Sequence, residues 1–266
     1  MDNGPASPAY AFPGPASLHP ATAISRGWAT FRSHAGPALV FMLVMIVCLC
    51  VGEVIPFVNL LFVFLGAPVL GAGGARYLVR HVRGEAPPLS SVFDGFRRWP
   101  TVAGAMLLQM VVTLALLAPV FGALGATFGL ALLLHPGAAS LPSPSPGAML
   151  PMFVAMPVCY AAMAWWYART WPLAFLVMEP GCPGAMEAFK ASFAMTRGNA
   201  WRSVGLFLLA LPLEVVGLAA LCIGIFPAML TWYYGVAHGY EMLRGADPAA
   251  PSAPADGAPG EPAIVV

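Results

Sequence analysis

The feature that most constrains this chain is a series of long apolar runs that contain no charged side chain. No Asp, Glu, Lys or Arg lies between Arg32 and Glu53, or from Thr101 to Leu134. A helix that crosses the hydrocarbon core of a bilayer needs about 20 predominantly apolar residues. Charged residues make up 9% of the 266 residues, and the mean hydropathy is +0.79, whereas soluble domains carry about 25% charged residues. The sequence therefore predicts an all-α, polytopic membrane protein.

The apolar runs and the turns between them predict six transmembrane helices. The run 101–134 would make a single helix of about 51 Å, which exceeds a hydrocarbon core of about 30 Å. We therefore expect a break near Pro119, followed by a kinked, re-entrant or protruding helix over 119–134. The expected spans cover about 33–52, 55–75, 101–118, 150–178, 201–223 and 227–243.

The distribution of cations predicts the orientation. With six spans and both termini inside, the Lys and Arg residues other than Arg169 lie in the cytosol or at its interface, as the positive-inside bias requires. Residues 1–20 and 245–266 are rich in Pro, Ala, Gly and Ser, which favours disordered cytoplasmic tails flanking one membrane domain at 21–244. The expected location is a bacterial cytoplasmic (inner) membrane.

Two segments between spans predict short amphipathic helices at the membrane surface. Leu89, Val92, Phe93 and Phe96 follow an i, i+3, i+4, i+7 pattern that is typical of one helical face. In the segment 185–199, apolar residues alternate with charged ones at a helical spacing, and a glycine near its end suits a helix C-cap. Such helices lie in the interface with their apolar face toward lipid.

Arg169 and Glu214 are charged residues inside expected spans, which makes them the leading candidate for a special site. At about 1.5 Å per residue, Arg169 would lie about 15 Å from Glu179 along its helix, and Glu214 about 20 Å from Trp201. One interpretation is a buried ion pair that fixes helix packing. The other is a polar point in the path of a transported substrate.

Basic residues at the cytoplasmic side form a second candidate site. Each could add about 1 kcal/mol of attraction to anionic lipid headgroups, or they could serve only to set the topology. A net charge of +1 argues against a nucleic-acid partner, because phosphate contacts need concentrated cations. The candidate lipid contacts are Arg76, Arg80, Arg83, Arg97 and Arg98.

Tyr234, His238 and Glu241 share one face near the end of the last span and predict an interfacial hydrogen-bonded cluster. The H-x-x-E spacing suits metal ligands, but a zinc site needs three or four, and no matching set accompanies the pair. The sequence contains no nucleophile elbow, HExxH or Walker motif. We therefore expect no catalytic, metal or cofactor site.

Three segments share a plan in which an aromatic-bearing stretch with Gly and Arg leads into a span. They are ISRGWATFRSHAG, VFDGFRRWPTVAG and SFAMTRGNAWRSVG. Internal repeats are common in transport folds, which raises that possibility. The alternative is that any helix entering the membrane from the cytosol needs an aromatic anchor and a cation.

A set of residues near the fourth and fifth spans carries a resemblance to known sequences. The set comprises Tyr167, Arg169, Glu179, Ala188, Ser192, Thr196, Gly198, Asn199 and Trp201. With these residues the chain resembles uncharacterised bacterial six-span membrane families, including the one named for the membrane domain of glycerophosphodiester phosphodiesterases. The resemblance covers about residues 20–244. It implies a fold and a location more than an activity, because the phosphodiesterase chemistry of such proteins resides in a separate soluble barrel, which this sequence lacks.

These features together predict a membrane-embedded accessory or scaffold protein without catalytic activity, whose protein partner is unknown. The main alternative is a transporter or lipid-handling protein with a polar point at Arg169 and Glu214. A transporter should show a continuous cavity that reaches Arg169, whereas a scaffold should show a closed bundle with the two residues in contact.

Overall fold

The computed structural model describes residues 17–54, 59, 62–134, 146–220 and 223–245, except for the side chains of 53–54, 127–134 and 146–152. All regular structure in these ranges is helical, which confirms the all-α prediction. Both expected tails fall outside the described residues, apart from 17–20 and 245. The elements are α1 (Pro20–Ser33), α2 (Ala35–Val54), the π-helical turn η2 (Phe62–Gly66), α4 (Ala67–Val82), the 3₁₀ helix η3 (Leu89–Arg98), α5 (Trp99–Leu134), α6 (Pro146–Thr170), α7 (Leu173–Leu176), α8 (Ala185–Met195), α9 (Ala200–Leu208), α10 (Ala210–Ala219) and α11 (Ile225–Arg244).

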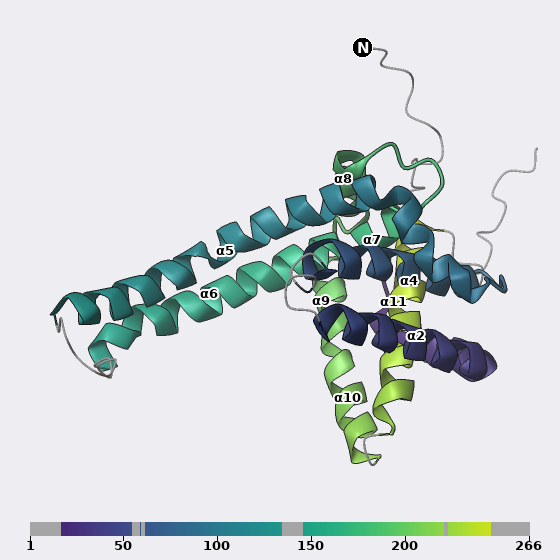
Figure 1. Ribbon diagram of the computed structural model, residues 1–266. Coiled ribbons are helices and arrows are strands. Elements are labelled where there is room, and N and C mark those ends of the chain that lie inside the picture. The colour runs from purple at the N-terminus through teal and green to yellow at the C-terminus, as the bar shows by residue number, and fades with distance from the viewer. Residues whose placement is uncertain (1–16, 55–58, 60–61, 135–145, 221–222, 246–266) are drawn as a thin grey trace, which may run out of the picture.

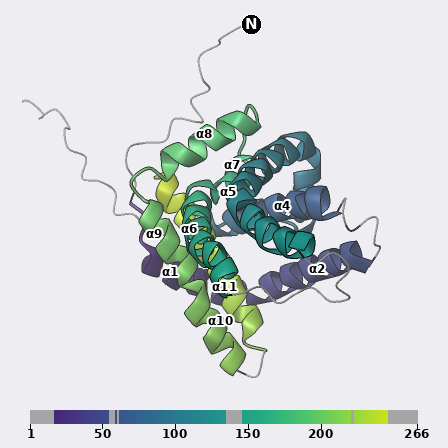
Figure 2. The ribbon, with the colours of Figure 1, turned by 90° about the vertical axis from the view of Figure 1, so that its left-hand side faces the viewer.

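The helices form three arms that radiate from a common centre. Helices α5 and α6 lie side by side and reach far to the left in Figure 1, whereas α10 and the neighbouring part of α11 point downward. In Figure 2, α2 extends to the right, away from α1. The view along the α5–α6 arm in Figure 2 shows the same divergence. We call the centre the hub; it comprises α1, α4, η3, α7, α8 and the C-terminal half of α11.

Four helical stretches within the described residues are long and apolar enough to cross a membrane. They are Ala35–Gly52, Phe62–Val82, Leu89–Ala126 and Ala200–Ala219. This supports an integral membrane protein, while the count of six spans stays a prediction. The second stretch extends beyond the expected end near residue 75, so Arg76 and Arg80 lie on helix α4 itself.

Helix α5 corrects the expected break near Pro119. It runs unbroken for 36 residues from Trp99 to Leu134 with Pro119 inside it, which corresponds to about 54 Å. Proline removes one backbone hydrogen bond and can kink a helix, but it need not end one. Residues 119–134 thus continue the same helix away from the hub, alongside α6 (Figure 1), and how this part sits relative to the bilayer stays a prediction.

The η3 segment is helical as predicted, but its faces differ from the prediction. In a 3₁₀ helix, residues three apart align, whereas the expected face assumed 3.6 residues per turn. Val92 and Gly95 are therefore buried together, whereas Phe93 and Phe96 are 43% and 47% exposed. Trp99 continues the exposed stripe at 54%. The outward face of η3 is aromatic, as suits a membrane interface.

Glycine pairs let two hub helices touch their neighbours backbone to backbone. A Cβ on Gly73 of α4 would lie 1.8 Å from the carbonyl oxygen of Val92, and one on Gly95 of η3 would lie 2.0 Å from that of Val69. Helix α1 meets α11 in the same way, because a Cβ on Gly27 would lie 2.5 Å from the backbone nitrogen of Gly235. Small residues allow such close approach. Gly27 and Gly95 belong to two of the three repeated segments, so these two segments use their glycine for the same kind of backbone contact.

Candidate functional site

Charged side chains from three parts of the chain meet in the hub. Glu179, which follows α7, accepts hydrogen bonds through Oε1 from Arg83 Nη2 and from Arg244 Nη1, the latter at 3.1 Å. Arg83 also donates to Oε1 of Glu241, with Nη2 at 2.7 Å. The hydroxyl of Tyr240 donates to Glu179 at 3.2 Å. We call these five residues the hub network; they connect α4, the segment after α7, and the last turns of α11.

The helices explain why these residues converge. Arg83 is the C-cap residue of α4, and Glu241 and Arg244 are three apart in the last turn and a half of α11, so their side chains share a face. Gly245 adopts a left-handed conformation with φ 72°, which ends α11. The Glu241 side chain is only 3% exposed and that of Glu179 13%. These carboxylates could not be buried so deeply without their arginine partners.

Electrostatics favour the charged state of Arg83. Burial works to lower the pKa of its guanidinium, but hydrogen bonds and charges from Glu179 and Glu241 outweigh burial and hold that pKa above its usual value. The guanidinium therefore stays protonated at any physiological pH. Because it is already engaged by two carboxylates, Arg83 has little capacity left to bind an external anion.

Arg98 fastens η3 to the same place. Its Nη1 donates to the carbonyl oxygen of Glu179 at 2.7 Å and to that of Val177 at 3.3 Å. Carbonyl groups at the end of a helix have no intrahelical N–H donor, and Arg98 supplies a donor for these two. The end of η3, and with it the start of α5, is thus held against the segment after α7.

The basic residues proposed as lipid contacts divide into paired and exposed ones. Arg76 forms an ion pair with Asp94 at 3.5 Å, and Arg80 forms one with Glu85 at 2.5 Å. Arg83 and Arg98 are engaged in the hub. Arg97 is exposed on η3 beside Phe96, so it is the member of this group best placed to meet a lipid headgroup.

Helix α6 ends at Thr170, one residue after Arg169, and the chain turns at Trp171 and Pro172, so the expected unbroken helix from Arg169 to Glu179 is not present. Arg169 Nη2 donates to the carbonyl oxygen of Phe193 at 2.9 Å, and its guanidinium lies 5.0 Å from the centre of the Phe193 ring. The backbone carbonyl of Arg169 accepts a hydrogen bond from Ser192 at 2.8 Å. Arg169 therefore docks α8 onto the end of α6.

Glu214 lies apart from Arg169. It is exposed on α10, and the ion pairs among the described residues do not include one between the two. The proposed partnership is therefore absent from this structure. The prediction failed because it counted residues along one unbroken helix, whereas Pro172 cannot donate the backbone hydrogen bond that would continue α6.

The predicted cluster of Tyr234, His238 and Glu241 shares a helix face but not a common partner. The Tyr234 hydroxyl lies 3.5 Å from Nδ1 of the buried His81, and His238 Nε2 lies 2.8 Å from the Thr30 hydroxyl. Glu241 belongs to the hub network. Tyr234 and Glu241 thus tie α11 to α4 and its C-cap residue, whereas His238 ties α11 to α1. Among the described residues, no group of three or more His, Cys, Asp or Glu side chains could hold a metal ion.

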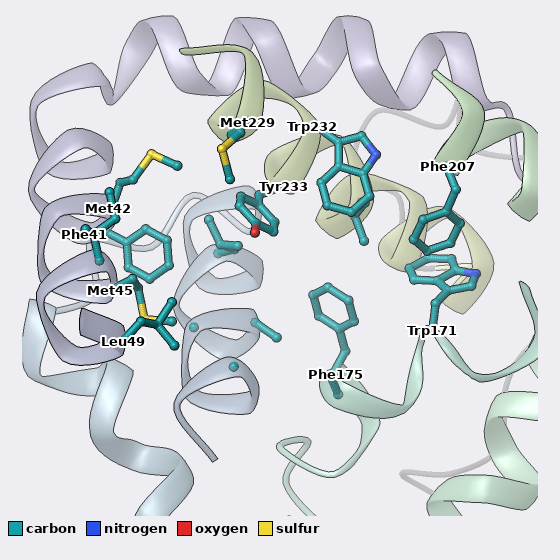
Figure 3. A pocket seen from close by; sticks show the side chains of 17 residues that line it. Phe41, Met42, Met45, Leu49, Trp171, Phe175, Phe207, Met229, Trp232 and Tyr233 are labelled. Atoms are coloured by element: carbon teal, nitrogen blue, oxygen red, sulfur yellow. The ribbon is translucent and has the colours of Figure 1, made fainter. Parts of the chain in front are cut away.

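A cavity of about 330 Å³ lies between α2, α4, α7, α9 and α11. Figure 3 shows side chains of α2 facing Trp171, Phe175 and the side chains of α11 across it. Its walls are apolar apart from the phenol of Tyr233, and neither Arg169 nor Glu214 lines it. No sequence pattern indicates this cavity, because helices α2, α4, α7, α9 and α11 each contribute only part of its wall.

Comparison with known proteins finds no matching family model, no matching curated protein and no matching solved structure.

Proposed function

We propose that this chain is a membrane-embedded accessory or scaffold protein without catalytic activity. The observation that carries the proposal is the hub network, in which two carboxylates and two arginines neutralise one another while fixing α4, α7 and α11. Charges that serve chemistry or transport usually face a polar cavity. Here they are used to hold three apolar arms in a defined arrangement.

The surface of the arms supports a role in lipid and in assembly. Large apolar side chains are exposed along each arm, among them Leu43 on α2, Val111 on α5 and Val215 on α10. The segments that lead into expected spans carry exposed aromatic residues. Trp201 at the start of α9, for example, is 84% exposed. Aromatic rings of this kind are favoured at the membrane interface. We place the hub network, which is the charged end of the hub, at the cytoplasmic interface of a bacterial inner membrane, in line with the family resemblance.

Cysteine labelling tests the placement of the hub. Arg97 on η3 and Lys190 on α8 are both exposed and lie on different hub elements. In a cysteine-free background, Arg97→Cys and Lys190→Cys should both react with a membrane-impermeant maleimide only after the cytoplasmic side is opened. Labelling from opposite sides would contradict the proposed topology.

The scaffold role is tested by native extraction of the tagged chain from its own membrane. We expect a defined complex larger than the 27.8 kDa chain. Glu241→Ala should dissolve this complex, since it breaks the hub, whereas Glu187→Ala should leave it intact because the Glu187–Lys190 pair is exposed. A chain that migrates alone under all extraction conditions would contradict a scaffold.

A second candidate, a lipid-handling protein, is favoured by the apolar cavity. The transport path proposed through Arg169 and Glu214 receives no such support, because neither residue lines that cavity. A flux assay in proteoliposomes distinguishes the two candidates, since a scaffold moves no solute or lipid across the bilayer.

A further inference from the structure

The cavity between α2, α4 and α11 has the properties of a binding site for a hydrocarbon chain. Its volume of about 330 Å³ falls at the lower end of the range for ligand pockets, about 300–1,000 Å³. The wall combines aromatic rings with Met42, Met45 and Met229. Methionine side chains adapt their shape to an irregular apolar ligand.

The indole N–H groups of the wall point away from the cavity, which leaves the phenol of Tyr233 as its polar group. The indole N–H of Trp171 donates to the Ser203 hydroxyl at 3.1 Å, and that of Trp232 donates to the carbonyl oxygen of Leu206 at 3.4 Å. Both rings therefore present apolar carbon to the cavity. Water needs two to four polar partners to occupy a buried site, and an apolar cavity that lacks them stays dry and accepts apolar ligands.

The cavity opens at the depth of a candidate span. Ile46 and Leu49 line it and are also 36% and 39% exposed, so its mouth lies beside the second half of α2. Helix α2 belongs to the candidate span Ala35–Gly52, and its neighbouring residues Leu43 and Val47 are exposed. The medium that faces this mouth is therefore lipid hydrocarbon rather than water.

We propose that this cavity holds one acyl chain of a membrane phospholipid, which enters sideways past Ile46 and Leu49. The acyl chain provides contacts that the wall atoms would otherwise lack, and it fills the space between α2 and the hub. This inference does not depend on the scaffold role, because a scaffold and a lipid-handling protein could each hold such a chain.

Photo-crosslinking of the full-length protein in proteoliposomes tests the proposal. The bilayer contains phosphatidylethanolamine and phosphatidylglycerol, with a trace of phosphatidylcholine that carries a diazirine near the end of one acyl chain. Mass spectrometry then gives the ratio of adducts on cavity residues, Met45 and Trp232, to adducts on the outward-facing Leu43. We expect abundant adducts in the cavity of the wild-type protein. Adducts confined to outward-facing residues would overturn the proposal.

Gly71→Leu supplies the matching variant. Gly71 lines the cavity, and a Cβ there would meet no atom within 4 Å, so a leucine can enter the cavity without disturbing the backbone. The ratio should fall about tenfold, which corresponds to lost contact with about two methylene groups. Gly125→Leu on α5 is the control, because Gly125 also has open space around it but lies outside the cavity wall.

Other occupants give different results. An isoprenoid lipid that co-purifies in stoichiometric amount while cavity adducts are absent would overturn the phospholipid assignment. Crosslinks between two copies of the chain at Ile46 would overturn it in favour of a dimer interface. If Gly71→Leu does not fold, Ile46→Trp at the mouth provides the second test, with the same fall in ratio expected and an unchanged ratio contradicting the proposal.

Discussion

Arg83 and Glu241 lie 158 positions apart in the sequence, yet Nη2 and Nε of the arginine lie 2.7 Å and 3.1 Å from one carboxylate oxygen of the glutamate. This contact joins the end of α4 to the last turns of α11. Since Glu179 pairs with the same guanidinium, the contact also fixes the segment after α7. One arginine thus holds together the parts of the hub from which the arms extend.

The first prediction concerns the loss of Glu241. Glu241→Ala should lower the free energy of unfolding by about 2 kcal/mol, less than the roughly 3–5 kcal/mol for breaking a fully buried pair, because Arg83 keeps Glu179. Reversible unfolding in mixed micelles measures this change. Glu187→Ala is the control, with an expected loss below about 1 kcal/mol for an exposed pair. Equal losses in the two variants would show that the hub network adds no special stability.

The second prediction concerns the crossing of α1 and α11. A Cβ on Gly27 would lie 2.4 Å from the carbonyl oxygen of Thr231, and backbone cannot yield as a flexible side chain does. Gly27→Ala should therefore displace α1 and cost about 1–3 kcal/mol, the range for overpacked sites. Gly36→Ala is the matched control, because a Cβ there meets nothing within 4 Å. Thermal unfolding in detergent measures the melting temperature of each variant. Equal melting temperatures for the two variants would contradict the prediction.

The sequence revealed the class of this protein but only part of its site. Long apolar runs fix a helical membrane fold whatever the neighbours are, and Arg83 and Glu241 were identified as candidates. They were assigned to separate sites, because a single sequence does not show which helix ends meet. Glu179, the residue that links them, marked the end of a span and carried part of the family resemblance, but it was not assigned to either site.

The errors at Arg169 and at η3 share a physical cause, which is the assumption of a regular α-helix. Continuing α6 past Pro172 placed Arg169 opposite Glu214. Applying 3.6 residues per turn to η3 grouped Val92 with Phe93, whereas the tighter helix puts them on different faces. The error at Pro119 has another cause: a proline removes one backbone hydrogen bond, but it need not end a helix.

The third prediction separates Arg169 from Glu214. Arg169→Ala removes the hydrogen bond to the Phe193 carbonyl and the contact with its ring, so amide hydrogen exchange in the C-terminal turn of α8 should become faster. Glu214→Ala should leave exchange in α8 unchanged, because Glu214 is exposed on α10. The charge-swapped double variant Arg169→Glu, Glu214→Arg should not restore slow exchange. Restoration would revive the ion pair that the sequence suggested.

The last prediction concerns how α5 sits in the membrane. With the hub at the interface, a position is buried in lipid only if it lies within about 30 Å of Arg98 along the helix. Leu114 lies about 24 Å away and Ala126 about 42 Å away, at about 1.5 Å per residue. In a cysteine-free background, Leu114→Cys should therefore resist a membrane-impermeant maleimide, whereas Ala126→Cys should react from the side opposite the hub. Both positions are outside the hub contacts, so neither substitution should unfold the protein. If both cysteines were protected, α5 would have to lie strongly tilted within the bilayer, and the α5–α6 arm would not emerge on the far side.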